Sequence, residues 1–266
     1  MKFSLSNNQT PAYLNKADEI YIKYKDRRAI PDYAEKYSAA TLTLEIPPQT
    51  EWDFNEIKEY SILSKGKLKI CIPEIRDERV AMLRNENIPF FWGYPISNGY
   101  ELESMRAMGV CEVRVTAPLF FYGDLLRECG VPIRVTANVA HEGYIPGMNG
   151  IIGSWIRPED VEVYEGIVDI IEFADCDMKK EQALYRIYAE QKNWPGRVDI
   201  LITNISTTAY NRMIPPTFAE SRINCRQRCV HGGSCRICER LLYLADKERI
   251  QAYIDSVEND EAISLT

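Results

Sequence analysis

The hydrophobic positions of this chain fall into short runs with a two-residue period, separated by longer stretches in which apolar residues recur every three or four positions. The short runs are rich in β-branched residues and predict strands, whereas the longer stretches predict helices. The predicted strands span residues 19–24, 40–46, 67–72, 89–94, 111–117, 132–138, 150–155, 169–175 and 199–204. The predicted helices span residues 52–62, 74–86, 97–108, 118–129, 158–165 and 178–192.

Strands and helices that alternate with short connections indicate a parallel sheet with helices outside it. The unit repeats every ~20–25 residues, and about eight units fit before residue 205, which matches a (β/α)8 barrel. A doubly wound sheet is the alternative, but no glycine-rich phosphate loop follows the first predicted strand. We therefore predict an α/β protein with a TIM-like barrel over residues 1–205. Residues 206–266 then form a C-terminal extension with a cysteine-rich segment and a closing helix.

An internal repeat supports this prediction and suggests a binding site. Two stretches share a helix-ending glycine (Gly109, Gly130), a strand and the tetrad Arg-Val-Thr-Ala. Each glycine fits the left-handed position that follows a helix end. Strand alternation places Arg114 and Arg134 on the face opposite the valines, so both point into the barrel if the valines pack under the helices. There they would bind the carboxylate or phosphate of a small anionic substrate, unless they form structural ion pairs near the bottom of the barrel.

Four cysteines crowd one short segment of the extension: Cys225, Cys229, Cys235 and Cys238. Thiolates are soft ligands, and four of them suit either a tetrahedral zinc ion or an iron–sulfur cluster. Two disulfides or a run of free thiols are the alternatives, but clustered cysteines in a reducing compartment are typical of metal ligands. The spacing differs from the separated C-x-x-C pairs of zinc fingers, so it leaves the metal open.

Composition and charge restrict the partners. The chain has 266 residues, of which 45% are hydrophobic, and a net charge of −7, which argues against nucleic-acid binding over the whole surface. Only the cysteine segment is basic, so an RNA contact is expected there alone. The first residues lack the apolar core of a signal peptide, and no segment has the length of a membrane span. These features predict a cytoplasmic protein without a membrane partner and leave homo- or hetero-oligomers open.

The candidates for catalysis are few. The chain has two histidines and contains neither a G-x-S-x-G nor an H-E-x-x-H motif. His141 follows the strand that contains Arg134, so it is a candidate general acid or base at the barrel mouth, or else a hydrogen-bonded loop residue. Glu172 and Asp175 lie on and just beyond a strand end, where barrel active sites assemble. They are candidates for proton transfer, and Glu172 is equally a candidate to neutralise an inward arginine.

A strand, a helix start, a second strand, a charged turn and an amphipathic helix follow one another over residues 150–191. Their marker residues are Ser154, Pro158, Glu159, Asp160, Ile170, Ile171, Glu172, Lys179 and Lys180. This order resembles the later part of the collagenase-like peptidase family. Residues 17–23 also look like that family's first barrel strand.

The resemblance implies a TIM-like barrel, often with an iron–sulfur cluster held by four cysteines. It further implies oxygen-independent hydroxylation of RNA bases or quinone precursors, or else peptidase activity. The longer family members place their cysteines before the helix that starts at Pro158, whereas here the cluster follows the last predicted strand. Cys176, just past a strand end, is a further candidate ligand. We favour a 4Fe–4S enzyme over a peptidase, and over a binding or assembly protein with a structural zinc site.

Overall fold

The structure, a computed structural model, describes residues 1–96, 98–115, 123–139, 156–190, 194, 198–203 and 218–224. The chain divides into two compact units. The first comprises Met1–Thr116, Glu128–Val135 and Val168–Glu172, and the second comprises Ala117–Arg127, Thr136–Ile167 and Phe173–Thr266. The predicted domain boundary at residue 205 stays a prediction.

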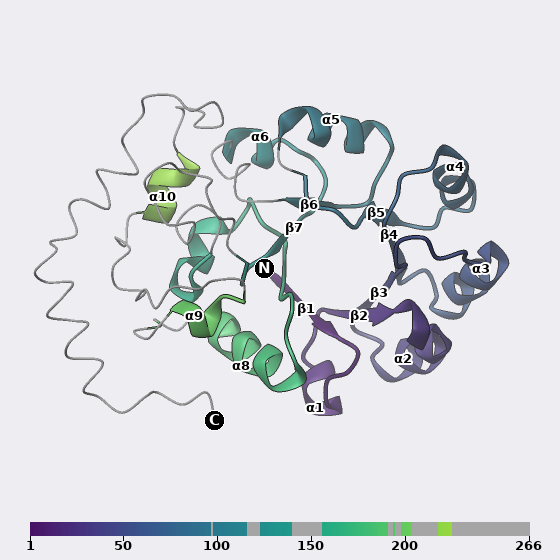
Figure 1. Ribbon diagram of the computed structural model, residues 1–266, viewed down its shortest axis with the longest axis horizontal. Helices are drawn as coiled ribbons and strands as arrows, with labels where there is room; N and C mark the ends of the chain where they lie inside the picture. Colours follow the sequence, from purple (N-terminus) through teal and green to yellow (C-terminus); the bar gives the residue numbers. More distant parts are fainter. Residues whose placement is uncertain are drawn as a thin grey trace, which may run out of the picture. The chain divides into compact units, whose positions relative to one another are not determined.

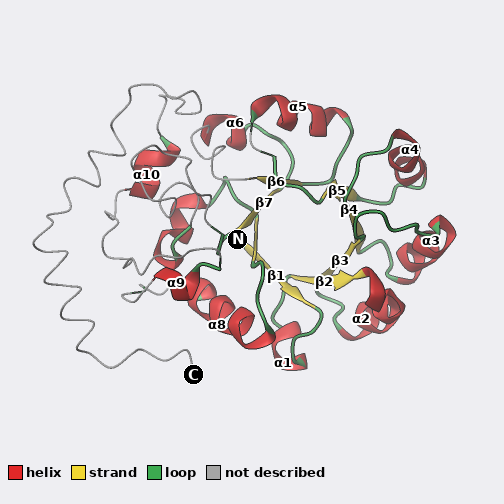
Figure 2. Ribbon diagram, in the orientation of Figure 1, coloured by secondary structure: helices red, strands yellow, loops and turns green. Residues whose placement is uncertain are grey.

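Parallel strands form a barrel in the first unit, with helices outside it (Figures 1 and 2). The strands are β1 (Lys2–Ser6), β2 (Glu19–Lys23), β3 (Thr41–Glu45), β4 (Leu68–Ile72), β5 (Phe90–Trp92), β6 (Val113–Val115), β7 (Ile133–Thr136) and β8 (Ile170–Glu172). They pair in the order β5-β4-β3-β2-β1-β8-β7-β6. Each strand thus lies beside its neighbour in the sequence, and β8 lies beside β1, as in a (β/α)8 barrel.

The two ends of this sheet, β5 and β6, are also joined. Ile96, just beyond β5, forms a parallel bridge with Val115. Its N–H donates to the carbonyl oxygen of Arg114 at 2.8 Å, and the N–H of Cys111 donates to the carbonyl oxygen of Phe90 at 2.8 Å. These contacts bring the ends of the sheet together, so the predicted barrel is confirmed and the doubly wound alternative, an open sheet, is wrong.

Side-chain caps mark the starts of two of the outer helices of the first unit. They are α1 (Pro11–Leu14), the 3-10 helix η1 (Tyr24–Ala29), α2 (Ile30–Lys36), α3 (Phe54–Leu63), α4 (Asp77–Asn85) and α5 (Gly99–Ala107). Helix α3 starts at Asp53, whose side chain accepts the N–H of Asn55, and α5 starts at Asn98 in the same manner. Gly109 and Gly130 both have φ 74°, which confirms the two predicted left-handed helix ends.

The second unit contains short helices around a buried tyrosine. Its described elements are α6 (Gly123–Arg127), the 3-10 helix η3 (Pro158–Tyr164), α8 (Met178–Ala189), α9 (Val198–Leu201) and α10 (Phe218–Ile223). Tyr188 is fully buried on α8, donates its hydroxyl hydrogen to the carbonyl oxygen of Ile156 at 2.6 Å, and packs against the ring of Phe173. Helix α8 thereby packs against η3.

Two strand assignments from the sequence are wrong. The first barrel strand is β1, not the strand at residues 17–23, which is the second. Residues 199–204 were expected to be a strand, but Val198–Leu201 form helix α9. The predicted strand at residues 150–155 lies outside the described residues. Within the described residues, no helix combines the length and hydropathy that a bilayer span requires.

Candidate active site

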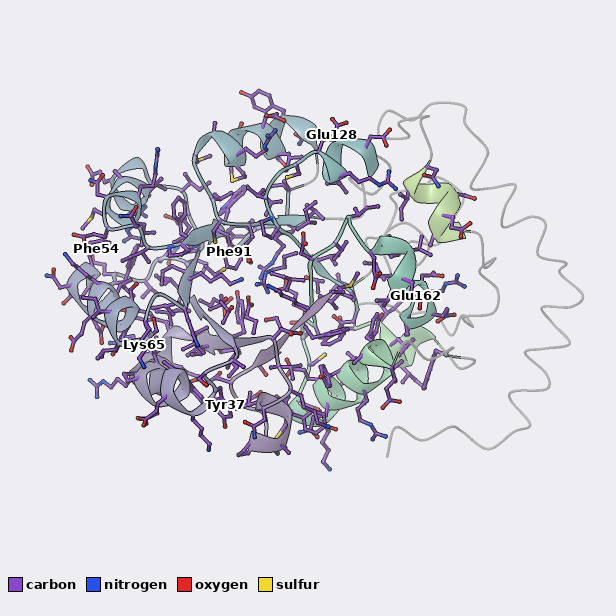
Figure 3. The ribbon with its side chains drawn as sticks, turned by 180° about the vertical axis from the view of Figure 1, so that it is seen from behind. Tyr37, Phe54, Lys65, Phe91, Glu128 and Glu162 are labelled. Carbon is purple, nitrogen blue, oxygen red and sulfur yellow. The ribbon has the colours of Figure 1, made fainter. Side chains whose placement is uncertain are left out.

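Strand register determines which side chains face the barrel interior. Residues opposite each other on neighbouring strands point to the same face of a sheet. Lys23 lies opposite Glu45, Glu45 opposite Cys71, and Cys71 opposite Phe91, across strands β2 to β5. Phe91 is fully buried among the inward side chains, whereas Lys65 lies on the outside of the unit (Figure 3). The whole row from Lys23 to Phe91 therefore faces inward.

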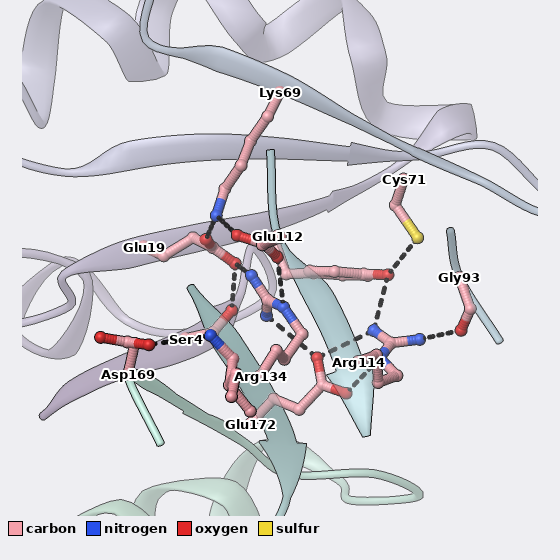
Figure 4. A network of polar contacts seen from close by, with 12 residues as sticks. Ser4, Glu19, Lys69, Cys71, Gly93, Glu112, Arg114, Arg134, Asp169 and Glu172 are labelled. Atoms are coloured by element: carbon pink, nitrogen blue, oxygen red, sulfur yellow. Dashed lines mark hydrogen bonds and ion pairs between the residues drawn. The ribbon is translucent and has the colours of Figure 1, made fainter. Parts of the chain in front are cut away.

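A guanidinium group lies at the centre of the barrel and is fully buried. Arg134 on β7 bonds through Nε to Glu112 at 2.6 Å, through Nη2 to Glu19 at 2.5 Å and through Nη1 to Glu172 at 3.0 Å (Figure 4). Lys69 on β4 forms ion pairs with both Glu19 and Glu112. We call Glu19, Lys69, Glu112 and Arg134 the interior ion network. Its four residues lie at the first or second position of β2, β4 and β7 and just before β6, so the network lies near the amino ends of these strands.

The second arginine lies closer to the carboxyl ends. Arg114 on β6 forms an ion pair with Glu172, in which its Nε lies 2.8 Å from Oε1 and its Nη2 donates a hydrogen bond to Oε2 at 2.9 Å. Its Nη1 donates to the carbonyl oxygen of Gly93, and Nη2 also donates to the hydroxyl oxygen of Tyr21 at 3.4 Å. Glu172 thus links Arg114 to Arg134. Together with Arg114 and Glu172, the interior ion network comprises three cations and three carboxylates, so the formal charges of these six residues cancel.

A thiol and a phenol adjoin this pair without being ionised near neutral pH. The hydroxyl group of Tyr21 donates to Cys71 Sγ at 3.2 Å. Burial raises the pKa of the Cys71 thiol to about 11, and burial also raises the pKa of Tyr21 well above its usual value. Cys71 is therefore a neutral thiol, not an activated nucleophile.

One carboxylate at the mouth has no such partner. Glu45, the last residue of β3, is half-buried and faces inward. Burial raises the pKa of its carboxyl group, and this effect outweighs the opposing influence of Arg114 and Lys23. We call Lys23, Glu45, Arg114 and Glu172 the mouth cluster. Barrel enzymes assemble their active sites at this end of the strands, and a perturbed carboxyl pKa is typical of a proton-transfer group.

The structure brings together three of the residues singled out from the sequence. Arg114 and Arg134 point into the barrel, as strand alternation predicts, and Glu172 binds both of them. Every nitrogen atom of the Arg134 guanidinium group contacts a carboxylate. These contacts are those expected of a structural ion pair, which is the alternative to substrate binding. The predicted roles of both arginines in substrate binding, and that of Glu172 in catalysis, stay predictions.

The remaining candidates lie in the second unit or outside the described residues. Asp175 is exposed in the second unit with φ 50°, a left-handed conformation that is uncommon for a non-glycine residue. Cys176 accepts a hydrogen bond from Asn138 Nδ2 at 3.4 Å, and burial raises the pKa of its thiol to about 11. His141 and the four clustered cysteines lie outside the described residues. Within those residues, no group of His, Cys, Asp or Glu side chains could hold a metal ion.

Sequence reasoning missed Glu19, Lys23, Glu45, Lys69 and Glu112. A signal for them existed, because a charged residue at an inward position of an otherwise apolar strand requires a partner. Lys69 alternates with Leu68, Ile70 and Ile72 in a strand whose residues are all buried. The sequence did not reveal which carboxylates meet it, because that depends on the stagger of the closed barrel.

Comparisons with known proteins add no assignment. No protein-family model matches the chain, and no curated protein matches it. Similar solved structures include a native KDPGal structure (10% identity over 71% of this chain and 92% of that chain, TM-score 0.44). They also include a 3-keto-L-gulonate-6-phosphate decarboxylase from Vibrio cholerae O1 biovar El Tor (13% identity over 75% of this chain and 98% of that chain, TM-score 0.43). A further one is an L-ribulose 3-epimerase (8% identity over 98% of each chain, TM-score 0.38). These TM-scores lie below 0.5, and the fold assignment rests on the strand pairing instead.

Proposed function

We propose that this chain is an enzyme that transfers protons to and from a small polar substrate at the mouth of its barrel, with Glu45 as general acid and base. The observation that carries the proposal is the state of Glu45. Its carboxylate lies at the carboxyl end of a barrel strand and has no hydrogen-bond or ion-pair partner among the described residues. Burial raises its pKa above the ordinary value, and a raised carboxyl pKa favours a group that accepts and donates protons.

The neighbours of Glu45 support this role. Arg114 and Glu172 form a closed pair, so they present a fixed, neutral wall beside it. Lys23 lies opposite Glu45 on the adjacent strand and is exposed, so it can approach a substrate without first breaking an ion pair. Neither the Arg114–Glu172 pair nor Lys23 has to rearrange substantially before the reaction, and catalysis benefits from such preorganised charges.

The test is proton exchange from solvent. The protein, purified anaerobically, is incubated in D2O with a mixture of small metabolites, and deuterium incorporation is followed by NMR. We expect Glu45→Gln to slow the exchange by on the order of 10²-fold, the usual contribution of a general base. The wild-type rate should rise with pH through the raised pKa of Glu45. Glu51→Gln, which removes an exposed carboxylate from the following loop, is the matched control. Equal rates for wild type and Glu45→Gln would exclude the proposal.

A metal centre is the second part of the proposal. Cys225, Cys229, Cys235 and Cys238 are the candidate ligands, and the resemblance to the collagenase-like peptidase family favours an iron–sulfur cluster, which would supply redox chemistry, over zinc. We expect the anaerobic protein to contain about four iron atoms per chain and to lose them when the four cysteines are replaced by serine. Cys111→Ser is the control. A colourless protein with one zinc atom would instead support a structural clip.

A further inference from the structure

The mouth cluster also indicates what kind of molecule it binds. We propose that its ligand is an uncharged polyhydroxylated molecule, one that donates hydrogen bonds to Glu45, rather than a carboxylate or phosphate. This inference rests on the proposed function and names the substrate class of the same site. Three observations carry it: the charge of the cluster, the unused acceptors of Glu45, and the state of the nearby helix ends.

The first observation is charge. The cluster contains two cations and two carboxylates, and the guanidinium group of Arg114 is already paired with the carboxylate of Glu172. The guanidinium group is thus not available for the paired contact by which arginine binds a carboxylate or phosphate. Lys23 remains, but it lies directly opposite Glu45 in the strand register. An anion that approached Lys23 would also meet the negative charge of Glu45, and like charges at such range repel.

The second observation is the unused hydrogen-bonding capacity of Glu45. An ionised carboxylate is a pure acceptor with two oxygen atoms, and a half-buried one loses part of its hydration. No described residue donates a hydrogen bond to the carboxylate of Glu45. A ligand with several hydroxyl groups supplies the missing donors without adding charge, whereas a carboxylate or phosphate ligand supplies further acceptors. The cluster therefore complements a donor-rich, uncharged molecule.

The third observation concerns two other places at which a barrel can bind an anion, the starts of helices α3 and α5. A helix that follows a barrel strand begins at the carboxyl end of the barrel, and its free N–H groups are a common phosphate site. In the first unit, the start of α3 is capped by the Asp53 carboxylate, which accepts the N–H of Asn55 at 2.8 Å. The start of α5 is capped by Asn98, which accepts the N–H of Glu101 at 2.9 Å. The acidic residues Asp53, Glu56 and Glu101 at these two helix starts disfavour an anion there.

The test uses ligand pairs that share a carbon skeleton and differ in charge. The pairs are D-glucose with D-gluconate, D-ribose with D-ribose 5-phosphate, and xylitol with D-xylonate. Binding to the purified holoprotein is measured by ligand-observed NMR near neutral pH and at constant ionic strength, up to about 50 mM ligand, which covers weak millimolar affinities. We expect at least one neutral member to bind about 10-fold more tightly than its anionic partner, which is the size of a single like-charge contact.

Variants connect the preference to the mouth cluster. Glu45→Gln should weaken binding of the neutral ligand and reduce the difference within a pair, because an amide carries no charge and offers one acceptor oxygen instead of two. Glu51→Gln should behave like wild type. Tighter binding of the anionic members, or no binding of any neutral member, would overturn the ligand class. The deuterium-exchange assay separates this failure from that of the proposed function. If Glu45→Gln slows the exchange but the wild-type protein prefers anions, the proposed function stands and the proposed ligand class is wrong.

Discussion

Arg134→Met is expected to lower the free energy of unfolding by about 3–5 kcal/mol, the usual cost of removing one partner from a buried ion pair. Arg134 is fully buried and binds Glu19, Glu112 and Glu172 at once. Methionine fills a similar volume but leaves these carboxylates short of a cation, and Glu19 and Glu112 are buried. The measurement is urea unfolding at neutral pH, from the midpoint and slope of the transition.

The matched control is Arg106→Met on helix α5. Arg106 forms an ion pair with Glu103 at 2.9 Å, but both side chains are exposed, so the expected loss is about 0–1 kcal/mol. If both variants lost the same small amount, the interior ion network would contribute no more than surface charges do. A fully unfolded Arg134→Met protein would agree with the prediction, and Glu172→Gln, which removes a charge nearer the mouth, would then give a measurable intermediate value.

Acid should unfold the barrel through Glu19. Burial alone would raise the pKa of its carboxyl group, but Arg134 and Lys69 outweigh this effect and hold the pKa at about 2, below the ordinary value of 4.5. A group with a depressed pKa in the folded state stabilises the fold above its unfolded pKa, and this contribution is lost as the pH falls towards its folded pKa. The wild-type unfolding free energy should therefore decline between pH 4.5 and about 2.

The control for this prediction is the change of the unfolding free energy with pH in two variants. Glu19→Gln should be less stable than wild type at neutral pH but should lose less further stability on acidification, because glutamine does not titrate. Glu103→Gln, which removes an exposed carboxylate, should keep the wild-type slope. Denaturant titrations at a series of pH values give these slopes directly. Parallel curves for wild type and Glu19→Gln would contradict the assignment of the acid response to Glu19.

Much of the barrel was predictable because its strands are marked by local patterns. Strands β2 to β8 coincide with predicted runs, and the two glycine-ended helices before β6 and β7 fall where the repeat placed them. Strand β1 was missed because only Phe3 and Leu5 are apolar in Lys2–Ser6, too few to show a period. Residues 198–201 failed for the opposite reason, since a short apolar run does not distinguish a strand from a helical turn.

The site was predictable only in part. The direction of a side chain follows from its position in its own strand, whereas its ion-pair partner depends on how distant strands are arranged. Alternation within one strand was enough to place Arg114 and Arg134 inside the barrel. Their carboxylates lie 22 to 115 residues away along the chain, and no local pattern matches them. Glu45 was missed because an acidic residue at the end of a strand is not unusual in a sequence. What makes it a candidate is the burial of its carboxylate and the lack of a hydrogen-bond donor among the described residues, and both depend on the closed barrel.

The Glu19–Arg134 pair also affects how the chain is made. The two residues are 115 positions apart, so β2 leaves the ribosome long before β7 has been synthesised. Until then Lys69 is the cation of the interior ion network that has been made, and the growing sheet would have to bury Glu19 and Glu112 with this single cation in order to close. Contacts of such long sequence separation are associated with slow folding. A nascent chain that stops before Arg134 should therefore remain open and depend on chaperones, and barrel closure should follow the synthesis of β7.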